Sequence, residues 1–205
     1  MNISRIALKF HSVPKFEPDA VIGQISADFE RGRFAKVSTC VHRAGKLYRR
    51  DNMALLLVQH GKSLPKDKDP EKGLSDEGNI DVKRIADAAK KYGVNVSCIK
   101  HSGKKRARQT ADIFASALQP ALGVQEIGGI NPMDDIASFA DSISSGEDLM
   151  IAGHLPFMEK LVSFLITGSI AKPVIKFQNG GIVCLNEDPD SHSWVIKWAL
   201  MPDIK

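Results

Sequence analysis

The chain has 205 residues, of which 43% are hydrophobic and 25% charged, so it can bury one substantial core and is expected to form one domain or slightly more. No stretch approaches the roughly 20 apolar residues of a membrane-spanning helix, and the N-terminus lacks the pattern of a signal peptide. The three cysteines, Cys40, Cys98 and Cys184, form neither a paired disulfide framework nor a CxxC metal motif. We therefore expect a cytoplasmic globular protein with buried thiols and no membrane association.

The formal net charge of +4 arises at one end of the chain. Residues 1–52 hold ten Lys or Arg against five Asp or Glu, whereas residues 53–205 hold 18 against 19. A basic surface on a folded domain favours nucleic-acid binding, but the chain beyond residue 52 is close to neutral. No nucleic-acid partner is therefore expected.

Residues 1–52 show no sustained periodicity, and they alternate charged residues with isolated apolar ones. We expect a poorly structured N-terminal extension here, followed by one domain over residues 53–205. Met53 begins the first strongly apolar segment, and Arg49-Arg50 could be encoded by a purine-rich stretch that resembles a bacterial ribosome-binding site. We hypothesise that the native polypeptide starts at Met53, in which case residues 1–52 are not translated.

Beyond Met53 the sequence alternates strand and helix signals. Short apolar segments predict strands at 54–59, 96–100, 124–127, 148–152, 181–186 and 193–201. Amphipathic segments with capping and stop signals predict helices at 76–92, 104–118, 133–142 and 157–166. Ser75 is the expected N-cap of the first helix, with Ile80, Ile85 and Ala88 on its buried face. This order predicts an α/β three-layer sandwich with a mostly parallel central sheet and a C-terminal hairpin at the sheet edge.

Histidines follow three of these predicted strands, at the sheet edge where loops and helix N-termini converge. His60 follows the first strand, His101 the second and His154 the fourth, and Arg106 lies in the first turn of the helix after His101. A neutral imidazole, with an ordinary pKa of about 6.5, offers a lone pair that can attack phosphorus. A guanidinium at a helix N-terminus can bind two phosphoryl oxygens, and Gly61 is expected to let the backbone approach them.

Each of these residues has a plainer interpretation when it is taken alone. A single histidine is usually structural, an arginine in a first helical turn is usually solvated, and His101, before a turn, is more often structural than a neighbour of the site. Lys104, Lys105 and Arg108 either form a solvated face or attract anionic substrates. The coincidence of histidines at three strand ends favours the functional interpretation of His60 and His154. No role is assigned to the remaining histidines, which are His11, His42 and His192.

Four motifs, in this order, resemble the histidine phosphatase superfamily and, within it, the small bacterial phosphohistidine phosphatases called SixA. Residues 57–61 (Leu-Val-Gln-His-Gly) resemble the family's Arg-His-Gly strand end, and residues 74–78 (Leu-Ser-Asp-Glu-Gly) resemble its Leu-Thr-x-x-Gly helix start. Residues 102–110 resemble Ser-Pro-x-x-Arg-Ala-x-Gln-Thr, and residues 153–156 (Gly-His-Leu-Pro) resemble the second-histidine motif. The resemblance covers residues 54–202, and the four motifs are specific because they occur together.

The resemblance implies a phosphoglycerate mutase-like fold in which His60 is the phosphorylated nucleophile and Arg106 and His154 hold the phosphoryl oxygens. It implies no metal and no other cofactor. The short length, without a large inserted cap, points to the SixA branch, so the expected substrate is a phosphohistidine on a signalling protein such as a histidine phosphotransfer domain. A small phosphomonoester is the alternative within the superfamily, and the protein is expected to be a monomer or a homodimer.

The chain departs from the family at Gln59, where an arginine is most common. An amide brings no charge, so a charge-assisted hydrogen bond of about 1.5–3 kcal/mol becomes an ordinary one. Turnover is expected to fall by about one to two powers of ten, unless a nearby lysine such as Lys62 contributes charge. Asp135, or else Asp134, is the candidate general acid, and helix N-capping is the alternative for both carboxylates.

Two other classes of function stay open. One is a phosphoryl-binding module without turnover, in which Gln59 marks a decayed enzyme. The other is a metallohydrolase that uses His60, His101, His154 and Asp135, although no HxH or HxxxH pair places two ligands next to each other.

Overall fold

The computed structural model describes residues 54–143, 148–188, 191 and 193–203. The expected N-terminal extension, the Met53 start and the remaining histidines named above lie outside the described residues. The strands are β1 (Ala54–Gln59), β2 (Cys98–His101), β3 (Val124–Glu126), β4 (Leu149–Gly153), β5 (Ile182–Glu187) and β6 (Trp194–Leu200). The helices are α2 (Asp76–Lys91), α3 (Lys105–Leu118), α4 (Ile136–Asp141) and α5 (Phe157–Thr167). Every predicted strand and helix of the domain is present, with ends shifted by up to three residues.

The strands form one six-stranded sheet in the order β3-β2-β4-β1-β5-β6. The pairs β1 with β4, β4 with β2 and β2 with β3 are parallel, whereas β5 runs antiparallel to both β1 and β6. The C-terminal pair β5 and β6 is the predicted hairpin at the edge of the sheet. Because β1, β2 and β4 are parallel neighbours, the residues that follow them emerge at the same edge of the sheet.

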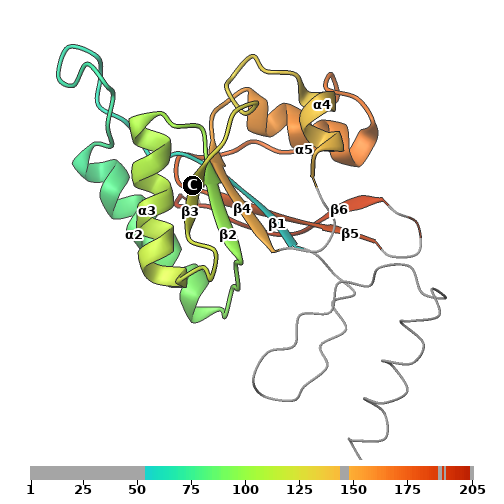
Figure 1. Ribbon diagram of the computed structural model, residues 1–205, viewed down its shortest axis with the longest axis horizontal. Coiled ribbons are helices and arrows are strands. Elements are labelled where there is room, and N and C mark those ends of the chain that lie inside the picture. Colours follow the sequence, from blue (N-terminus) through green and yellow to red (C-terminus); the bar gives the residue numbers. More distant parts are fainter. Residues whose placement is uncertain (1–53, 144–147, 189–190, 192, 204–205) are drawn as a thin grey trace, which may run out of the picture. The chain divides into compact units, whose positions relative to one another are not determined.

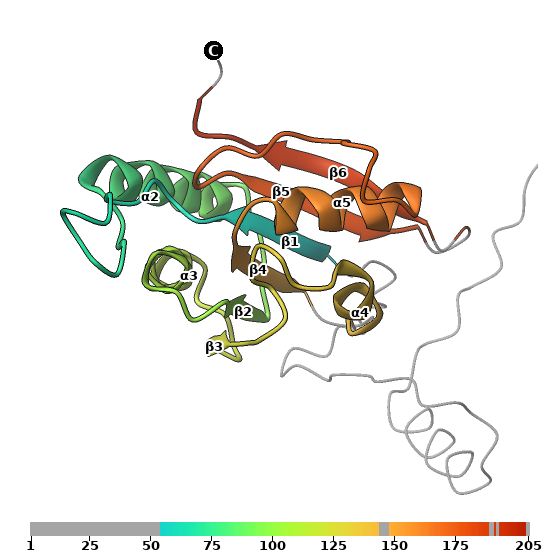
Figure 2. The ribbon, with the colours of Figure 1, turned by 90° about the horizontal axis from the view of Figure 1, so that it is seen from above.

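Both faces of β1 are buried, which explains its continuous apolar sequence. Leu56 and Val58 pack with the buried side chains of α2 and α3 in one core. Leu55 and Leu57 pack with those of α4 and α5 in a second core. Figures 1 and 2 show α2 with α3 on one side of the sheet and α4 with α5 on the other, which confirms the predicted three-layer sandwich.

Helix α2 begins as predicted, because the Ser75 side chain accepts a hydrogen bond from the Gly78 N–H at 3.1 Å. Its buried face consists of Gly78, Val82, Ile85, Ala86 and Ala89. The prediction that Ile80 lies on this face is wrong, since its side chain is 67% exposed, and Ala88 is only half-buried. Ile80 and Val82 are two residues apart and therefore point to nearly opposite sides of a helix. Val82 is the residue that packs in the core.

Helix α4 begins three residues later than predicted, at Ile136. Residues 131–134 form a turn instead, in which Asn131 N–H donates to Asp134 Oδ2 at 2.7 Å and Asp134 N–H donates to Asn131 O at 3.1 Å. An aspartate that bonds the backbone three residues away favours a turn over a helix interior. Among the described helices, none combines the length and the apolar character that a membrane span requires.

Candidate active site

His60 directly follows β1, and its backbone is held by neighbouring segments on both sides. Its N–H donates to Gly153 O at the end of β4 at 3.0 Å, and its O accepts from Asn179 Nδ2–H at 2.9 Å. The backbone N–H of Gly180, the residue after Asn179, donates to Gln59 O at 2.8 Å. The position of the His60 ring therefore depends on contacts with β4 and with the segment before β5.

The protonation of the His60 ring follows from its two hydrogen bonds. Its Nδ1 lies 2.8 Å from Gly61 O, and a carbonyl oxygen only accepts, so Nδ1 carries the proton. Its Nε2 accepts from Arg106 Nε–H at 3.0 Å and therefore carries the lone pair. Burial lowers the pKa of His60 to about 4, with smaller effects of the Arg106 and Lys104 charges in the same direction and of the Gly61 bond against them. The ring is neutral at neutral pH, with its lone pair at Nε2.

Arg106 reaches His60 from the first turn of α3, and Thr110 connects this turn to the same loop. Thr110 Oγ1 donates to Arg106 O at 2.8 Å and accepts from Gly61 N–H at 3.0 Å. Thr110 is fully buried, so both of these bonds are shielded from water. Burial lowers the pKa of Arg106 from its very high ordinary value. Arg106 remains a cation and presents its charge at the N-terminal end of a helix, where an anion is favoured.

His154 follows β4 and lies against His60, with 4.9 Å between the ring centroids and an angle of 60° between the rings. The residue is 1% exposed. Burial lowers the pKa of His154 to about 3, and the neighbouring His60, Arg106 and Lys104 contribute in the same direction. Its Nε2 lies 2.6 Å from Ser102 Oγ, and its Nδ1 is buried without a hydrogen-bond partner in the described part of the chain.

Lys104, the N-cap residue of α3, is close enough for its charge to affect the two site histidines. Its charge lowers the pKa of both site histidines, and burial followed by the Arg106 charge lowers the pKa of Lys104 itself. Lys62, which the sequence suggested as a source of charge, pairs with Glu77 instead. Lys105 pairs with Asp69 and Glu71, and Arg108 is exposed near Asp112.

Gln59 ends β1 beside the histidine pair, and its Oε1 is buried with no hydrogen-bond partner among the described residues. A buried amide oxygen of this kind loses hydration without a replacement, which costs about 1–3 kcal/mol. The position where the resembling family most often has arginine is therefore incompletely satisfied in this chain.

Gly61 has a packing role in this structure. A Cβ at Gly61 would lie 2.6 Å from Val82 Cγ2 and 3.1 Å from Gly78 O, so only glycine allows this loop to approach α2 so closely. Its N–H is already bonded to Thr110. These contacts favour packing over the phosphate approach that the sequence suggested.

Asp135 is exposed and caps α4. Its carboxylate accepts from Ala137 N–H at 3.1 Å and from Ser138 Oγ–H at 2.6 Å. The bond from Ser138 and then that from Ala137 lower the pKa of Asp135, which weakens it as a proton donor. The capping interpretation is favoured for Asp135. Asp134 lies close enough to Lys104 for its charge to oppose, in part, the lowering of that lysine's pKa by burial and by Arg106.

His101 is 5% exposed and bonds within its own turn, where its Nδ1 accepts from Gly103 N–H at 3.0 Å. This is the structural interpretation of His101. Within the described residues, no three His, Cys, Asp or Glu side chains are grouped in a way that could hold a metal ion. The structure thus brings together His60, Arg106 and His154, but it does not join His101 and Asp135 to them as a metal site.

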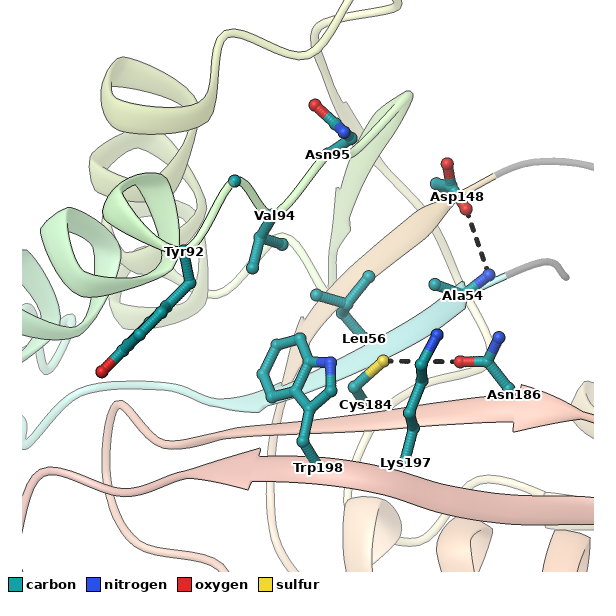
Figure 3. A pocket seen from close by; sticks show the side chains of 11 residues that line it. Ala54, Leu56, Tyr92, Val94, Asn95, Asp148, Cys184, Asn186, Lys197 and Trp198 are labelled. Atoms are coloured by element: carbon teal, nitrogen blue, oxygen red, sulfur yellow. Dashed lines mark hydrogen bonds between the residues drawn. The ribbon is translucent and has the colours of Figure 1, made fainter. Parts of the chain in front are cut away.

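A pocket of about 280 Å³ lies near the start of β1, at the other end of that strand from His60. Figure 3 shows the side chains that line this pocket. It is lined by Ala54 at the start of β1, by Tyr92 after α2 and by Lys197 and Trp198 of β6, among others. His60, by contrast, follows the last residue of β1. We place the candidate active site at the histidine pair because the His60 ring there contacts both the Arg106 guanidinium and the His154 ring.

The sequence matches no protein-family model, and no curated protein matches it. Solved structures do match the chain. One is the protein histidine phosphatase SixA complexed with tungstate, at 20% identity over 73% of this chain and 97% of that chain, with a TM-score of 0.62. Another is a putative phosphohistidine phosphatase SixA from Agrobacterium tumefaciens, at 21% identity over 73% of this chain and 98% of that chain, with a TM-score of 0.58.

A third similar structure is a putative alpha-ribazole-5'-P phosphatase from Escherichia coli K-12. It is 14% identical over 75% of this chain and 98% of that chain, with a TM-score of 0.59. These similarities span nearly the whole of each matched protein. They confirm that the domain has the phosphoglycerate mutase-like fold that is found in the histidine phosphatase superfamily.

The protonation of His60 can be measured directly. In phosphate-free buffer, long-range ¹H–¹⁵N spectra are expected to show His60 as the Nδ1–H tautomer at pH 7 and to show its protonation at about pH 4. Arg106→Met should raise the pKa of His60, because it removes a neighbouring positive charge. Protonation of His60 near its ordinary value of about 6.5 in the unsubstituted protein would contradict the described burial and hydrogen bonding.

Proposed function

We propose that this chain is a phosphatase of the histidine phosphatase superfamily that works through a covalent phosphohistidine on His60. The observation that carries the proposal is the hydrogen bond of 3.0 Å from Arg106 Nε–H to His60 Nε2, next to a second histidine. This contact supports the proposed roles of His60 as a neutral nucleophile and of Arg106 as a phosphate-binding cation. A tetrahedral anion bound by Arg106 would have its phosphorus in reach of the His60 lone pair.

In the first step, the Nε2 lone pair of His60 forms a bond to phosphorus while the bond from phosphorus to the leaving atom breaks. The leaving group takes that electron pair. Arg106 turns its N–H groups from His60 to the non-bridging oxygens and offsets their charge, with Lys104 adding a second positive charge near them. The Nδ1–H bond to Gly61 O stabilises the positive charge that develops on the imidazole ring.

In the second step, water attacks the phosphorus of phosphorylated His60 and releases a proton to the solvent, the P–N bond breaks with its electrons returning to Nε2, and inorganic phosphate leaves. A leaving imidazole or alkoxide needs a proton in the first step. Asp135 is bonded to its own helix, so for a phosphohistidine substrate we propose that water supplies this proton, because a phosphoramidate bond is intrinsically labile. Asp135 remains the candidate acid for less labile phosphate esters.

We propose that the substrate is a phosphohistidine on a cytoplasmic signalling protein. The support comes from the similarity to the two SixA structures, which covers 97% and 98% of those chains. A small phosphate ester is the second candidate, and the similarity to the alpha-ribazole-5'-P phosphatase favours it.

The covalent intermediate provides the test of this function. Brief exposure to an aryl phosphate labelled in its phosphoryl group is expected to leave acid-labile, base-stable label on the protein. His60→Ala should abolish the label and Arg106→Ala should strongly reduce it, whereas Arg108→Ala, which removes an exposed cation from the same helix, should retain it. Saturable phosphate binding without any label would instead identify a binding module.

Gln59→Arg is expected to raise kcat/KM for an aryl phosphate by about 10- to 100-fold, because it adds a charge-assisted bond to the phosphoryl group. Gln125→Arg adds the same charge at an exposed position of β3 and serves as the matched control, with kcat/KM unchanged. Steady-state kinetics of the three proteins make the comparison. Equal or lower turnover of Gln59→Arg would show that the site is adapted to the amide.

A further inference from the structure

Ser102 lies next to His154 in the turn that follows β2. It is the first residue after β2, and the turn is closed by the bond from Gly103 N–H to His101 Nδ1. Gly103 has a φ of +78°, and a Cβ there would lie 2.5 Å from Glu126 Oε1. The positive φ favours glycine at this position. The hydroxyl oxygen of Ser102 lies 2.6 Å from His154 Nε2.

Because Nε2 of His154 contacts Ser102, Nδ1 is the one ring nitrogen that has no partner among the described residues. A neutral imidazole has one N–H and one lone pair, whereas a hydroxyl group can either donate or accept. If Nε2 carried the proton, Nδ1 would present a lone pair to the oxygens of a bound phosphoryl group and repel them. If Ser102 donates to Nε2, the proton is on Nδ1, and Nδ1–H becomes a donor for those oxygens.

We propose that Ser102 is a positioning residue that donates its O–H to His154 Nε2 and thereby fixes the proton of His154 on Nδ1. The buried Nδ1, without a partner among the described residues, is then the atom that bonds the phosphoryl oxygen. The effect on turnover depends on the proposed function, whereas the placement of the proton does not. Both site histidines would share one tautomer, with His60 using its lone pair at Nε2 and His154 using its proton at Nδ1.

This arrangement prepares the donor before the substrate binds. A donor that is already oriented needs no tautomer shift when negative charge develops on the phosphoryl oxygens. Without the hydroxyl, Nε2 of a buried ring loses its partner, and both tautomers become accessible. The fraction of molecules with Nδ1–H ready for the phosphoryl group then falls.

The test compares Ser102→Ala and Ser102→Thr with the unsubstituted protein, in the absence of substrate. Long-range ¹H–¹⁵N spectra are expected to show His154 with its proton on Nδ1 and with the ¹⁵N shift of a hydrogen-bonded lone pair at Nε2. Ser102→Ala should move the Nε2 shift and mix the tautomers, and Ser102→Thr should restore both features because it keeps the hydroxyl. Ser116→Ala, at an exposed serine of α3, is the control that should leave them unchanged.

In kinetics, Ser102→Ala is expected to lower kcat by about 10- to 100-fold with a smaller change in KM, less than the about 10²–10³-fold loss seen when a transition-state donor is removed. A proton on Nε2 in the unsubstituted protein, or a His154 spectrum that Ser102→Ala does not alter, would overturn the inference. The spectra require no turnover. If His60 takes up no label while the spectra behave as described, the proposed function fails and the placement of the proton stands.

Discussion

The candidate site depends on the two hydrogen bonds that hold the His60 ring from opposite sides. Gly61 O accepts from Nδ1–H, and Arg106 Nε–H donates to Nε2, so the ring is fixed in orientation, in tautomer and in charge. The surrounding structure maintains this geometry. Thr110 connects the helix that carries Arg106 to the loop that carries Gly61, and Asn179 holds the backbone of His60 itself. Loss of either ring contact would free the imidazole to turn or to change tautomer.

Burial gives the site its electrostatic character. Two imidazoles with lowered pKa values lie beside the cations of Arg106 and Lys104, so the site is positive overall while both imidazoles stay uncharged at neutral pH. β1 ends in the neutral Gln59, so it adds no charge to the site. The second cation beside Arg106 is Lys104, the N-cap residue of α3. A doubly charged phosphoryl group would offset the charge of both cations. Two cations therefore remain to offset a phosphoryl group, although the arginine that the resembling family most often has at the end of this strand is absent.

The sequence predicted the alternating strands and helices, the parallel core of the sheet and the three strands that end next to a histidine. Each of these features depends on local patterns of apolar and turn residues. It did not predict the choice of Val82 over Ile80 for the core, which depends on how α2 is rotated against the sheet. Asn179 was missed because it lies 119 residues from His60 and belongs to no motif. The sequence indicates Ser102 only as part of a motif, because its contact with His154 joins two loops that meet only in the folded sheet.

The most direct measurement of the central claim is a crystal structure of the protein with orthovanadate, which adopts the geometry of a phosphoryl group in transfer. The account predicts vanadium bonded to His60 Nε2, with its oxygens bonded by Arg106 and by His154 Nδ1–H. Vanadate found only in the pocket beside Trp198, or at the histidine pair without contact to His60 Nε2, would contradict it.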